Sequence, residues 1–290
     1  MDQVIDYEDL FKKQLDELHA ERCKNKYLAS MLKYLASMLN VLNSNKNIGE
    51  KDELVAILQL YHLDTTQQYS KLVSIFGDAA SAGIEVIDLG TKEQIMIDNI
   101  KKAHPGSKSD IAIKMRKDCT EYNVSIKSKN GANPSLLNHT PRTANVFRET
   151  GVLYTQLRSI DALLHEYINK RNSKLTKEDI RLVDFECIQD PEVHADIIDL
   201  LVYFVFDGTG KGYSKNKANS ILLYNHSEFY FHKCLTKEEK TAYIVSILDK
   251  CVLSLREKGM PKVSTSDCAP WIYHDLDSGS QKGSLHIRMK

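Results

Sequence analysis

The sequence predicts an α+β fold in which helices and strands are mixed, and three observations lead to this prediction. Before residue 80, apolar residues recur at three- and four-residue spacing, which is typical of helices. After residue 80, short segments alternate apolar and polar residues, which is typical of strands with one face on a core. Helical and extended segments then follow one another without the regular alternation of a doubly wound fold. We therefore expect an N-terminal helical region at 1–80 and a mixed α/β part at 81–290.

Composition and charge narrow the classes of protein to which this chain can belong. Of its 290 residues, 42% are hydrophobic and 27% are charged, which suffices for a substantial core. Lys plus Arg equals Asp plus Glu, at 39 each, so any basic surface for nucleic acid must be local. No apolar run approaches the roughly 20 residues of a membrane span. The six cysteines lack the spacing of zinc sites. We expect a cytoplasmic protein with reduced thiols and no membrane segment.

A tandem duplication marks the longest expected helix, which runs from about Tyr7 to Leu42. Tyr27–Lys33 is followed at once by Tyr34–Asn40, and the second copy changes only the last residue. A seven-residue repeat keeps the same side chains nearly on one helix face. Two heptads do not establish a coiled coil, so this face either packs on the core or forms a contact in a homodimer.

Two shorter helices are expected at 51–61 and 66–76, joined by a polar link. They are either ordinary amphipathic helices or the halves of a DNA-reading helix-turn-helix. The other expected elements are strands at 84–89, 109–115, 122–127 and 220–224, helices at 92–103, 152–167 and 237–258, an apolar stretch at 197–206, a loop at 128–145, and extended segments at 262–273 and 284–289.

The expected hairpin at 109–127 carries the residues best suited to catalysis. Asp110 opens its first strand, and Ser125 and Lys127 lie two positions apart, on one face of its second strand. Hydrolysis of a phosphodiester needs a hard cation that neutralises phosphate charge and activates water, and a positive group that orients the water. One carboxylate and one lysine on neighbouring strands can meet these needs. The same pattern also fits a solvated strand face.

Longer stretches on both sides of the hairpin resemble a known family. The first block consists of Pro105-Gly-Ser-Lys-Ser-Asp110-Ile, Val124-Ser-Ile-Lys127-Ser-Lys, Gly131-Ala-Asn-Pro-Ser-Leu-Leu-Asn138-His-Thr140 and Thr143-Ala-Asn145-Val-Phe. It resembles HpaII-like type II restriction endonucleases of the PD-(D/E)xK superfamily. A second block, made of Lys217–Asn225, Ser264–Ser266 and Leu285–Arg288, resembles the C-terminal strands of that family. The likeness covers roughly residues 100–150 and 205–290.

The resemblance implies a restriction-endonuclease-like core, in which helices flank a mixed β-sheet, with a DNA-recognition part toward the C-terminus. It implies Asp110, Ser125 and Lys127 as catalytic positions and Mg²⁺ as the cofactor. Asp110 would bind the metal, and Lys127 would orient or activate the attacking water.

Ser125 departs from the family pattern, because an acidic residue is usual at its position and a hydroxyl is a poor metal ligand. A carboxylate from elsewhere would then complete the metal site, and Glu85, Glu93 and Glu121 are the candidates. The other alternative is a shifted pairing in which Ser128 or Lys129 takes part.

Two polar segments offer groups for DNA contact. The first is the loop at 128–145, and the second is the C-terminal extended region. Either could instead be ordinary solvated surface. The expected DNA-binding residues are Ser128, Lys129, Asn138, Thr140 and Arg142 in the first segment, and Lys262, Ser264, Gln281 and Arg288 in the second.

The leading hypothesis is a type II restriction endonuclease that cuts double-stranded DNA as a homodimer or as paired monomers. Its functional partner would be a cognate DNA methyltransferase, without a stable complex. The alternatives are a repair or junction nuclease of the same superfamily and a nuclease-fold DNA-binding module without catalysis. Gly208–Gly212 is expected to be a glycine-rich connection, because it lacks the spacing of a phosphate-binding loop.

Overall fold

A computed structural model provides the fold of this chain. It describes residues 8, 11–15, 26–100, 103, 106–130, 134–139, 183–184, 191–209, 212–226, 228–255, 273–274, 281–282 and 285–289. The chain forms two compact units. Unit 1 comprises 1–104, 109–132 and 221–232, and unit 2 comprises 105–108, 133–220 and 233–290. This division differs from the boundary expected at residue 80, which followed the change from helical to extended patterns rather than the packing.

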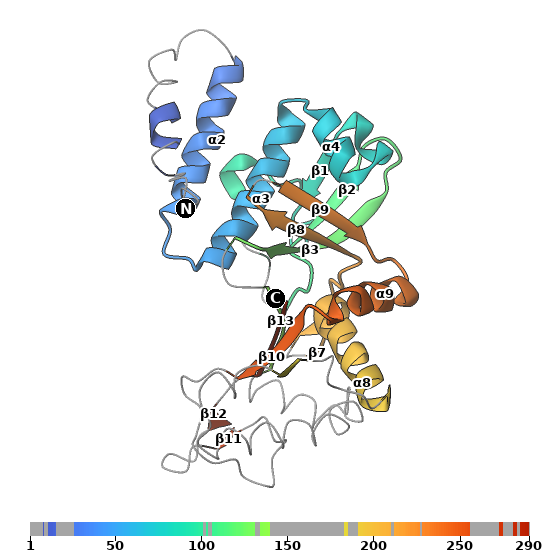
Figure 1. The fold of residues 1–290 in the computed structure, drawn as a ribbon. Coiled ribbons are helices and arrows are strands. Elements are labelled where there is room, and N and C mark those ends of the chain that lie inside the picture. The colour runs from blue at the N-terminus through green and yellow to red at the C-terminus, as the bar shows by residue number, and fades with distance from the viewer. Residues whose placement is uncertain are drawn as a thin grey trace. The chain divides into compact units, whose positions relative to one another are not determined.

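Unit 1 is built on a five-stranded sheet with the strand order β1-β2-β3-β8-β9 (Figure 1). Its strands are β1 (Ile84–Ile87), β2 (Ile111–Met115), β3 (Glu121–Ser128), β8 (Ser220–Asn225) and β9 (Glu228–Lys233). The first three form an antiparallel meander, in which Ile84 pairs with Met115 and Ile111 pairs with Val124. The hairpin expected at 109–127 is therefore confirmed as the pair of β2 and β3.

The last two strands make this sheet mixed. Lys129, the residue after β3, donates its backbone N–H to the carbonyl of Tyr224 near the end of β8, at 2.8 Å. Because β3 and β8 are neighbours and their C-terminal ends meet, they run parallel. β9 follows β8 closely in the chain and is its neighbour in the sheet, so it returns antiparallel. The mixed sheet and its helices confirm the α+β class.

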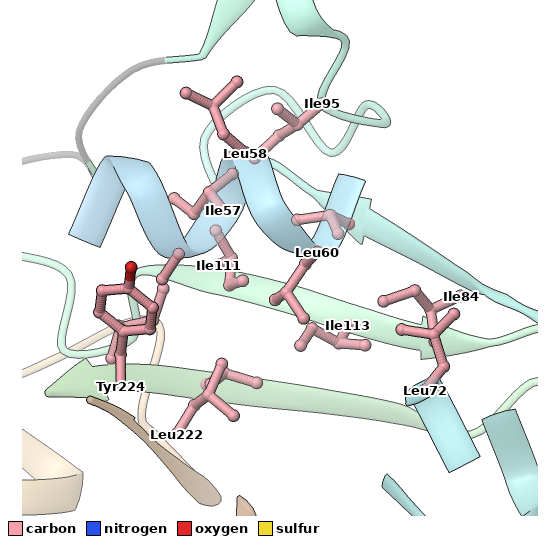
Figure 2. Packing of buried hydrophobic residues seen from close by; sticks show 14 of the residues in the cluster. Ile57, Leu58, Leu60, Leu72, Ile84, Ile95, Ile111, Ile113, Leu222 and Tyr224 are labelled. Carbon is pink, nitrogen blue, oxygen red and sulfur yellow. The ribbon is translucent and has the colours of Figure 1, made fainter. Parts of the chain in front are cut away.

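Two helices, α3 (Ile48–Thr65) and α4 (Tyr69–Phe76), pack on one face of the sheet, and α2 (Lys26–Leu42) packs on α3. Alternate strand residues face them, and Figure 2 shows α3 lying over β2 with Ile57 and Leu60 directed at the sheet. α3 begins after Asn47, whose side-chain oxygen accepts the N–H of Glu50 at 3.0 Å. The fully buried core side chains include Leu58, Leu60, Leu72, Phe76, Ile84, Ile111, Ile113, Val124, Ile126 and Leu222.

The duplicated segment lies in α2, and its second copy faces this core. Tyr34, Leu35 and Met38 are buried, and Met31 from the first copy packs partly against them. This burial supports the core-facing alternative for the repeat. α3 is likewise a core helix, with Leu54–Leu58 and Leu60 buried.

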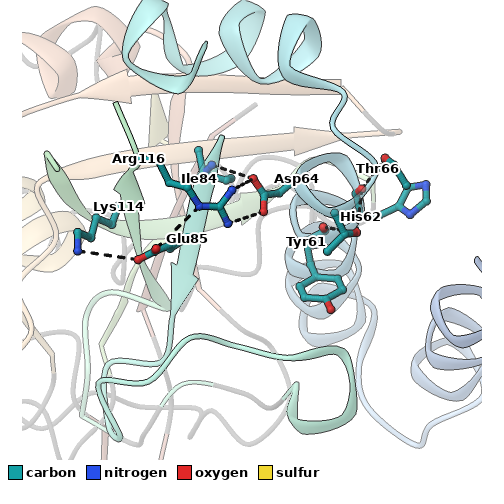
Figure 3. Close-up of polar contacts among 9 residues, drawn as sticks. Tyr61, His62, Asp64, Thr66, Ile84, Glu85, Lys114 and Arg116 are labelled. Carbon is teal, nitrogen blue, oxygen red and sulfur yellow. Dashed lines mark hydrogen bonds and ion pairs between the residues drawn. The ribbon is translucent and has the colours of Figure 1, made fainter. Parts of the chain in front are cut away.

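A buried ion pair ties the end of α3 to the sheet (Figure 3). The side chain of Asp64 is 8% exposed and accepts hydrogen bonds from Nη1 and Nη2 of Arg116, each at 2.8 Å. Its Oδ1 also accepts the backbone N–H of Ile84 at 2.9 Å, so one carboxylate fixes both β1 and β2. Hydrogen bonding to Asp64 raises the pKa of Arg116.

Unit 2 contains α8 (Pro191–Val202), a π-helical turn η4 (Tyr203–Asp207), and α9 (Lys237–Leu248), whose N-terminus is closed by a capping box of Thr236 and Glu239. A four-stranded sheet has the order β4-β13-β10-β5. Its strands are β4 (Ser135–His139), β13 (Leu285–Met289), β10 (Cys251–Leu255) and β5 (Val183–Asp184). Two further pairs of short strands form. β6 (Gly208–Thr209) pairs with β7 (Gly212–Tyr213), and β11 (Tyr273–His274) pairs with β12 (Gln281–Lys282). In the part of the chain described, no helix is both long and apolar enough to cross a membrane.

Several expected elements are corrected by the structure. The helix at 92–103 is wrong for its described part, because Ile95 donates its N–H to Val86 and only a 3-10 turn, η2 (Ile97–Asn99), forms. The helix expected at 237–258 ends at Leu248, Cys251–Leu255 forms β10, and residues 256–258 lie outside the described residues. The loop at 128–145 contains β4, which pairs with β13. The helix at 152–167 lies outside the described residues.

The pairing of β6 with β7 confirms Gly208–Gly212 as a glycine-rich connection. Gly208 also allows a close approach: a Cβ there would lie 2.1 Å from Cζ of Tyr203. The ring of Tyr203 is buried, and its hydroxyl donates to the carbonyl of Thr209 at 3.1 Å. The hairpin and the π-helical turn therefore fit together only without a side chain at 208.

Gly208→Ala is expected to destabilise unit 2 by about 1–3 kcal/mol, because the methyl group overpacks a buried ring. Hydrogen exchange of amides in α8 and β6 would measure the loss. The control is the same substitution in a Tyr203→Ala background, where the methyl group has room and the additional loss should be small. An equal loss in both backgrounds would contradict the steric explanation.

Candidate active site

The register of β2 and β3 places Asp110 opposite Ser125. Ile111 pairs with Val124, and Asp110, one residue earlier, donates its backbone N–H to the carbonyl of Val124 at 2.8 Å. Asp110 thus stands at the entrance to β2 and is held by the ladder of that strand. The hairpin expected over 109–127 therefore brings Asp110 beside Ser125.

The carboxylate of Asp110 takes the place of a strand carbonyl. Its Oδ2 accepts the backbone N–H of Ile126 at 2.7 Å, and the residue is half-buried. This hydrogen bond fixes the carboxylate against the segment of β3 between Ser125 and Lys127. A carboxylate positioned by backbone contacts has little freedom left to lose when it binds a ligand.

Ser125 and Lys127 lie on the face of β3 opposite the helices, because Tyr122, Val124 and Ile126 point into the helix-covered core. Ser125 is fully buried, and its hydroxyl has no hydrogen-bond partner among the described residues. A buried hydroxyl without a partner is uncommon and unfavourable. On the face of β3 opposite the helices, this hydroxyl is therefore available to hydrogen-bond or coordinate a ligand.

Lys127 is half-buried and makes no hydrogen bond or ion pair within the described part of the chain. Its neighbour two positions on, Lys129, is exposed. Burial, followed by the positive charge of Lys129, lowers the pKa of His232 on β9, so this imidazole is neutral at neutral pH. Two lysines therefore lie at the end of β3. Because the chain has no net charge, a phosphate-binding surface would need a local cluster of positive charge of this kind.

The three glutamates proposed to complete the metal site are not brought to Asp110. Glu85 lies 3.9 Å from the ammonium of Lys114 and 3.8 Å from Nε of Arg116. Glu121 is exposed at the start of β3, opposite Lys114 and away from Lys127. Glu93 is exposed and follows β1, where its carbonyl accepts the N–H of Asp88.

A carboxylate that sequence reasoning missed does reach this end of β3. The hydroxyl of Ser128 donates to Oδ2 of Asp52, in the first turns of α3, at 2.5 Å. Asp52 approaches β3 from the helix-covered face. It contacts Ser128, whereas Asp110 contacts Ile126, so the two contacts lie two residues, about 7 Å, apart along β3. Acidic side chains are common near helix N-termini, so nothing in the sequence singles out Asp52 as part of a site.

The donor set can be compared with the needs of Mg²⁺. Among the described residues, no group of three or more His, Cys, Asp or Glu side chains could hold a metal ion. Mg²⁺, however, is often held by one or two carboxylates, with substrate phosphates and water as the remaining ligands. Asp110, with the hydroxyl of Ser125 and the nearby backbone, fits an ion of that kind and not one enclosed by protein ligands.

The expected DNA-binding residues are divided between the two units. Ser128 and Lys129 lie in unit 1 beside the candidate site. In unit 2, Asn138 lies in β4 opposite His286 of β13, and β13 also carries Arg288. Gln281 lies in β12, opposite His274. The remaining four, Thr140, Arg142, Lys262 and Ser264, lie outside the described residues.

Comparisons with known proteins do not assign this chain to a family. No family model matches it, and neither the curated proteins nor the solved structures include a match. The candidate site at Asp110, Ser125 and Lys127 is therefore inferred from these residues and their geometry.

Proposed function

We propose that this chain is a magnesium-dependent endonuclease that hydrolyses phosphodiester bonds in double-stranded DNA, of the sequence-specific type II restriction kind. The observation that carries the proposal is the position of Asp110 opposite Ser125, with Lys127 two residues further along the same strand face. A carboxylate anchored to Ile126 and a lysine without a described partner then flank one short segment of β3.

The proposed roles follow from these positions. Asp110 provides the negative charge that holds the metal ion, and Mg²⁺, when bound, neutralises phosphate charge and lowers the pKa of a water molecule. Lys127 donates hydrogen bonds that orient the attacking water and stabilises charge that develops on the phosphate. Ser125 offers a hydroxyl where the resembling family has a carboxylate. Asp52 adds a second negative charge near the same end of β3.

A second function, DNA binding without cleavage, is favoured by one specific observation. Of the carboxylates considered for the metal site, Asp110 alone reaches the Ser125–Lys127 segment of β3 within the described residues, and Ser125 stands where the resembling family has its second acid. In this case the two lysines at the end of β3 would hold a DNA phosphate without hydrolysing it.

We also propose a biological setting for this activity. A type II enzyme of this kind would act in the cytoplasm as a homodimer or as paired monomers, and a cognate methyltransferase would protect the host's sites without a stable complex. A repair or junction nuclease would instead recognise DNA structure. The products of cleavage distinguish these roles.

Cleavage of plasmid DNA is expected to require Mg²⁺ or Mn²⁺ and to stop in excess chelator, while Ca²⁺ permits binding without cutting. The reason is that Ca²⁺ is larger and more loosely coordinated, and activates water poorly. Gel analysis of the digest and a gel shift in Ca²⁺ would measure both effects.

The same digest separates the candidate functions. Discrete bands support a restriction enzyme, and nicks confined to branched or damaged DNA support a structure-specific nuclease. Retained binding without cleavage in any divalent metal supports the binding module. Full activity in chelator would overturn the metal mechanism.

A further inference from the structure

A stretch of unit 2 that begins in the β6–β7 hairpin is rich in lysine. Residues 208–227 contain three lysines and no acidic residue. Within residues 213–217, here called the lysine segment, Tyr213, Lys215 and Lys217 are exposed and alternate with less exposed residues. The whole lysine segment belongs to one compact unit. Because the chain has no net charge, it forms a local positive surface and not part of a general one.

An aromatic ring holds one of these lysines. Tyr213 is 60% exposed, but its ring packs edge-on against Tyr203, with centroids 5.1 Å apart and an interplanar angle of 74°. Tyr203 is buried, so the exposed ring has a fixed support. The ammonium of Lys217 lies over the Tyr213 ring, 4.7 Å from its centroid. The position of this charge is therefore partly fixed before a ligand arrives, which reduces the entropy lost on binding.

The two lysines keep their positive charge unbalanced within the described part of the chain. There, the side chains of Lys215 and Lys217 form no ion pair or hydrogen bond. The acidic residue nearest to them in the sequence is Asp207, and its carboxylate already accepts the ammonium of Lys240 at 2.7 Å. Two exposed ammonium groups on a neutral protein favour a polyanion as the ligand.

A buried hydroxyl holds the lysine segment in shape. Ser214 is 6% exposed, and its Oγ accepts the backbone N–H groups of Lys108 at 3.0 Å and of Asn216 at 3.1 Å. The same Oγ lies 3.1 Å from the carbonyls of Gly106 and Asn216, to one of which it donates. These hydrogen bonds join residues 105–108 to the lysine segment within unit 2.

We propose that the lysine segment binds the phosphate backbone of double-stranded DNA, with Lys215 and Lys217 at phosphates and Tyr213 positioning Lys217. The choice of DNA rests on the proposed function, and one observation favours it: Lys108, which is bonded to the lysine segment, lies two residues before Asp110 in the chain. A lysine is a point charge on a flexible stem, which contacts phosphate without reading a base. The lysine segment therefore adds affinity that does not depend on DNA sequence.

Fluorescence anisotropy of labelled DNA duplexes, measured in Ca²⁺ over a series of salt concentrations, tests the proposal. The double variant Lys215→Ala/Lys217→Ala is expected to bind every duplex about tenfold more weakly, whatever its sequence. The slope of log K against log salt concentration should become smaller by about two, because each lost phosphate contact removes about one.

The role of the ring has its own test. Tyr213→Ala should weaken binding about threefold in the wild-type chain, because Lys217 loses its support. The same change should have no further effect when Lys217 is already alanine, and Tyr213→Phe, which retains the ring, should retain binding. Equal losses from Tyr213→Ala in both backgrounds would overturn the positioning role.

The matched control is Lys46→Ala/Lys250→Ala, which removes two exposed lysines outside the lysine segment with the same change in net charge. It should leave the affinity and the salt slope nearly unchanged. Cleavage assays on the same proteins separate this proposal from the proposed function. Weakened binding by the lysine-segment variant supports the DNA contact even if the wild-type chain cuts DNA in no divalent metal. Wild-type affinity and slope in that variant, an equal loss in the control, or no binding of DNA by the wild-type chain overturns it, whether or not DNA is cut.

Discussion

Replacing Lys127 with alanine is expected to reduce DNA cleavage about 100-fold or more and to leave DNA affinity nearly unchanged. Lys127 is assigned to the water and the scissile phosphate, whereas affinity comes from many backbone and base contacts. The loss should therefore appear in the chemical step. Asp110→Asn should have an effect of the same size. The asparagine oxygen can still accept the N–H of Ile126, so the strand contact survives while the metal-binding charge is lost.

Single-turnover cleavage, gel shifts in Ca²⁺ and thermal melting would measure these variants together. The matched control is Lys114→Ala on the adjacent strand β2, which removes a lysine paired with Glu85 at 3.9 Å and should leave cleavage unchanged. Near-normal cutting by a properly folded Lys127→Ala or Asp110→Asn protein would show that the site lies elsewhere. Loss of cutting in all three variants would show that the effect is not specific to the proposed residues.

Asp64→Ala is expected to destabilise unit 1 by about 1–3 kcal/mol, because a buried N–H and a half-buried guanidinium lose the carboxylate that accepts their hydrogen bonds. The substitution leaves the guanidinium of Arg116 without its two shortest contacts and leaves the N–H of Ile84, in a residue that is 1% exposed, without its acceptor. Native-state hydrogen exchange of amides in α3 and β1 is the suitable measurement, because a global melt would combine two compact units.

Two comparisons separate the buried pair from surface charge effects. Asp64→Asn keeps an acceptor for Ile84 and should lose less than alanine does. Lys117→Ala removes the exposed pair with Asp78, whose side chains are 47% and 83% exposed, and should cost less than about 1 kcal/mol. A loss at Asp64 no larger than that at Lys117 would contradict the role given to the ion pair.

Gly83 belongs to the same arrangement. Its φ is +94°, and a Cβ there would lie 2.5 Å from Nη1 of Arg116 and 2.6 Å from Oδ1 of Asp64. The ion pair therefore occupies space that only glycine leaves free, and the backbone conformation also favours glycine.

Strand periodicity made most of the unit 1 sheet predictable from sequence. In β3, the apolar residues Tyr122, Val124 and Ile126 alternate with polar ones and pack in the core. β9 was not predicted, because Phe229, Tyr230 and Phe231 are three consecutive aromatic residues. Such a run hides the alternation of apolar and polar residues that is typical of a strand. The end of α9 was missed because the apolar pattern continues through Leu248 into β10, and only pairing with β13 makes that segment a strand.

The candidate site was predictable where residues lie close in the chain. A short link joins β2 to β3, so the placement of Asp110, Ser125 and Lys127 on neighbouring strands followed from the hairpin alone. The contact of Asp52 with Ser128 joins residues 76 positions apart, and that of Lys108 with Ser214 joins residues 106 positions apart. Such juxtapositions arise from tertiary packing, which no local pattern encodes.

During synthesis, β3 is completed long before its parallel neighbour. Residues 129–219 separate β3 from β8, and most of them belong to unit 2. Unit 1 therefore cannot close its sheet until residues 221–232 have left the ribosome, and the outer edge of β3 stays open until then. Joining strands so distant in the chain is slow, because loop closure loses entropy before any contact compensates. A chain that stops within 129–219 would keep that edge permanently and is expected to aggregate instead of accumulating as a folded fragment.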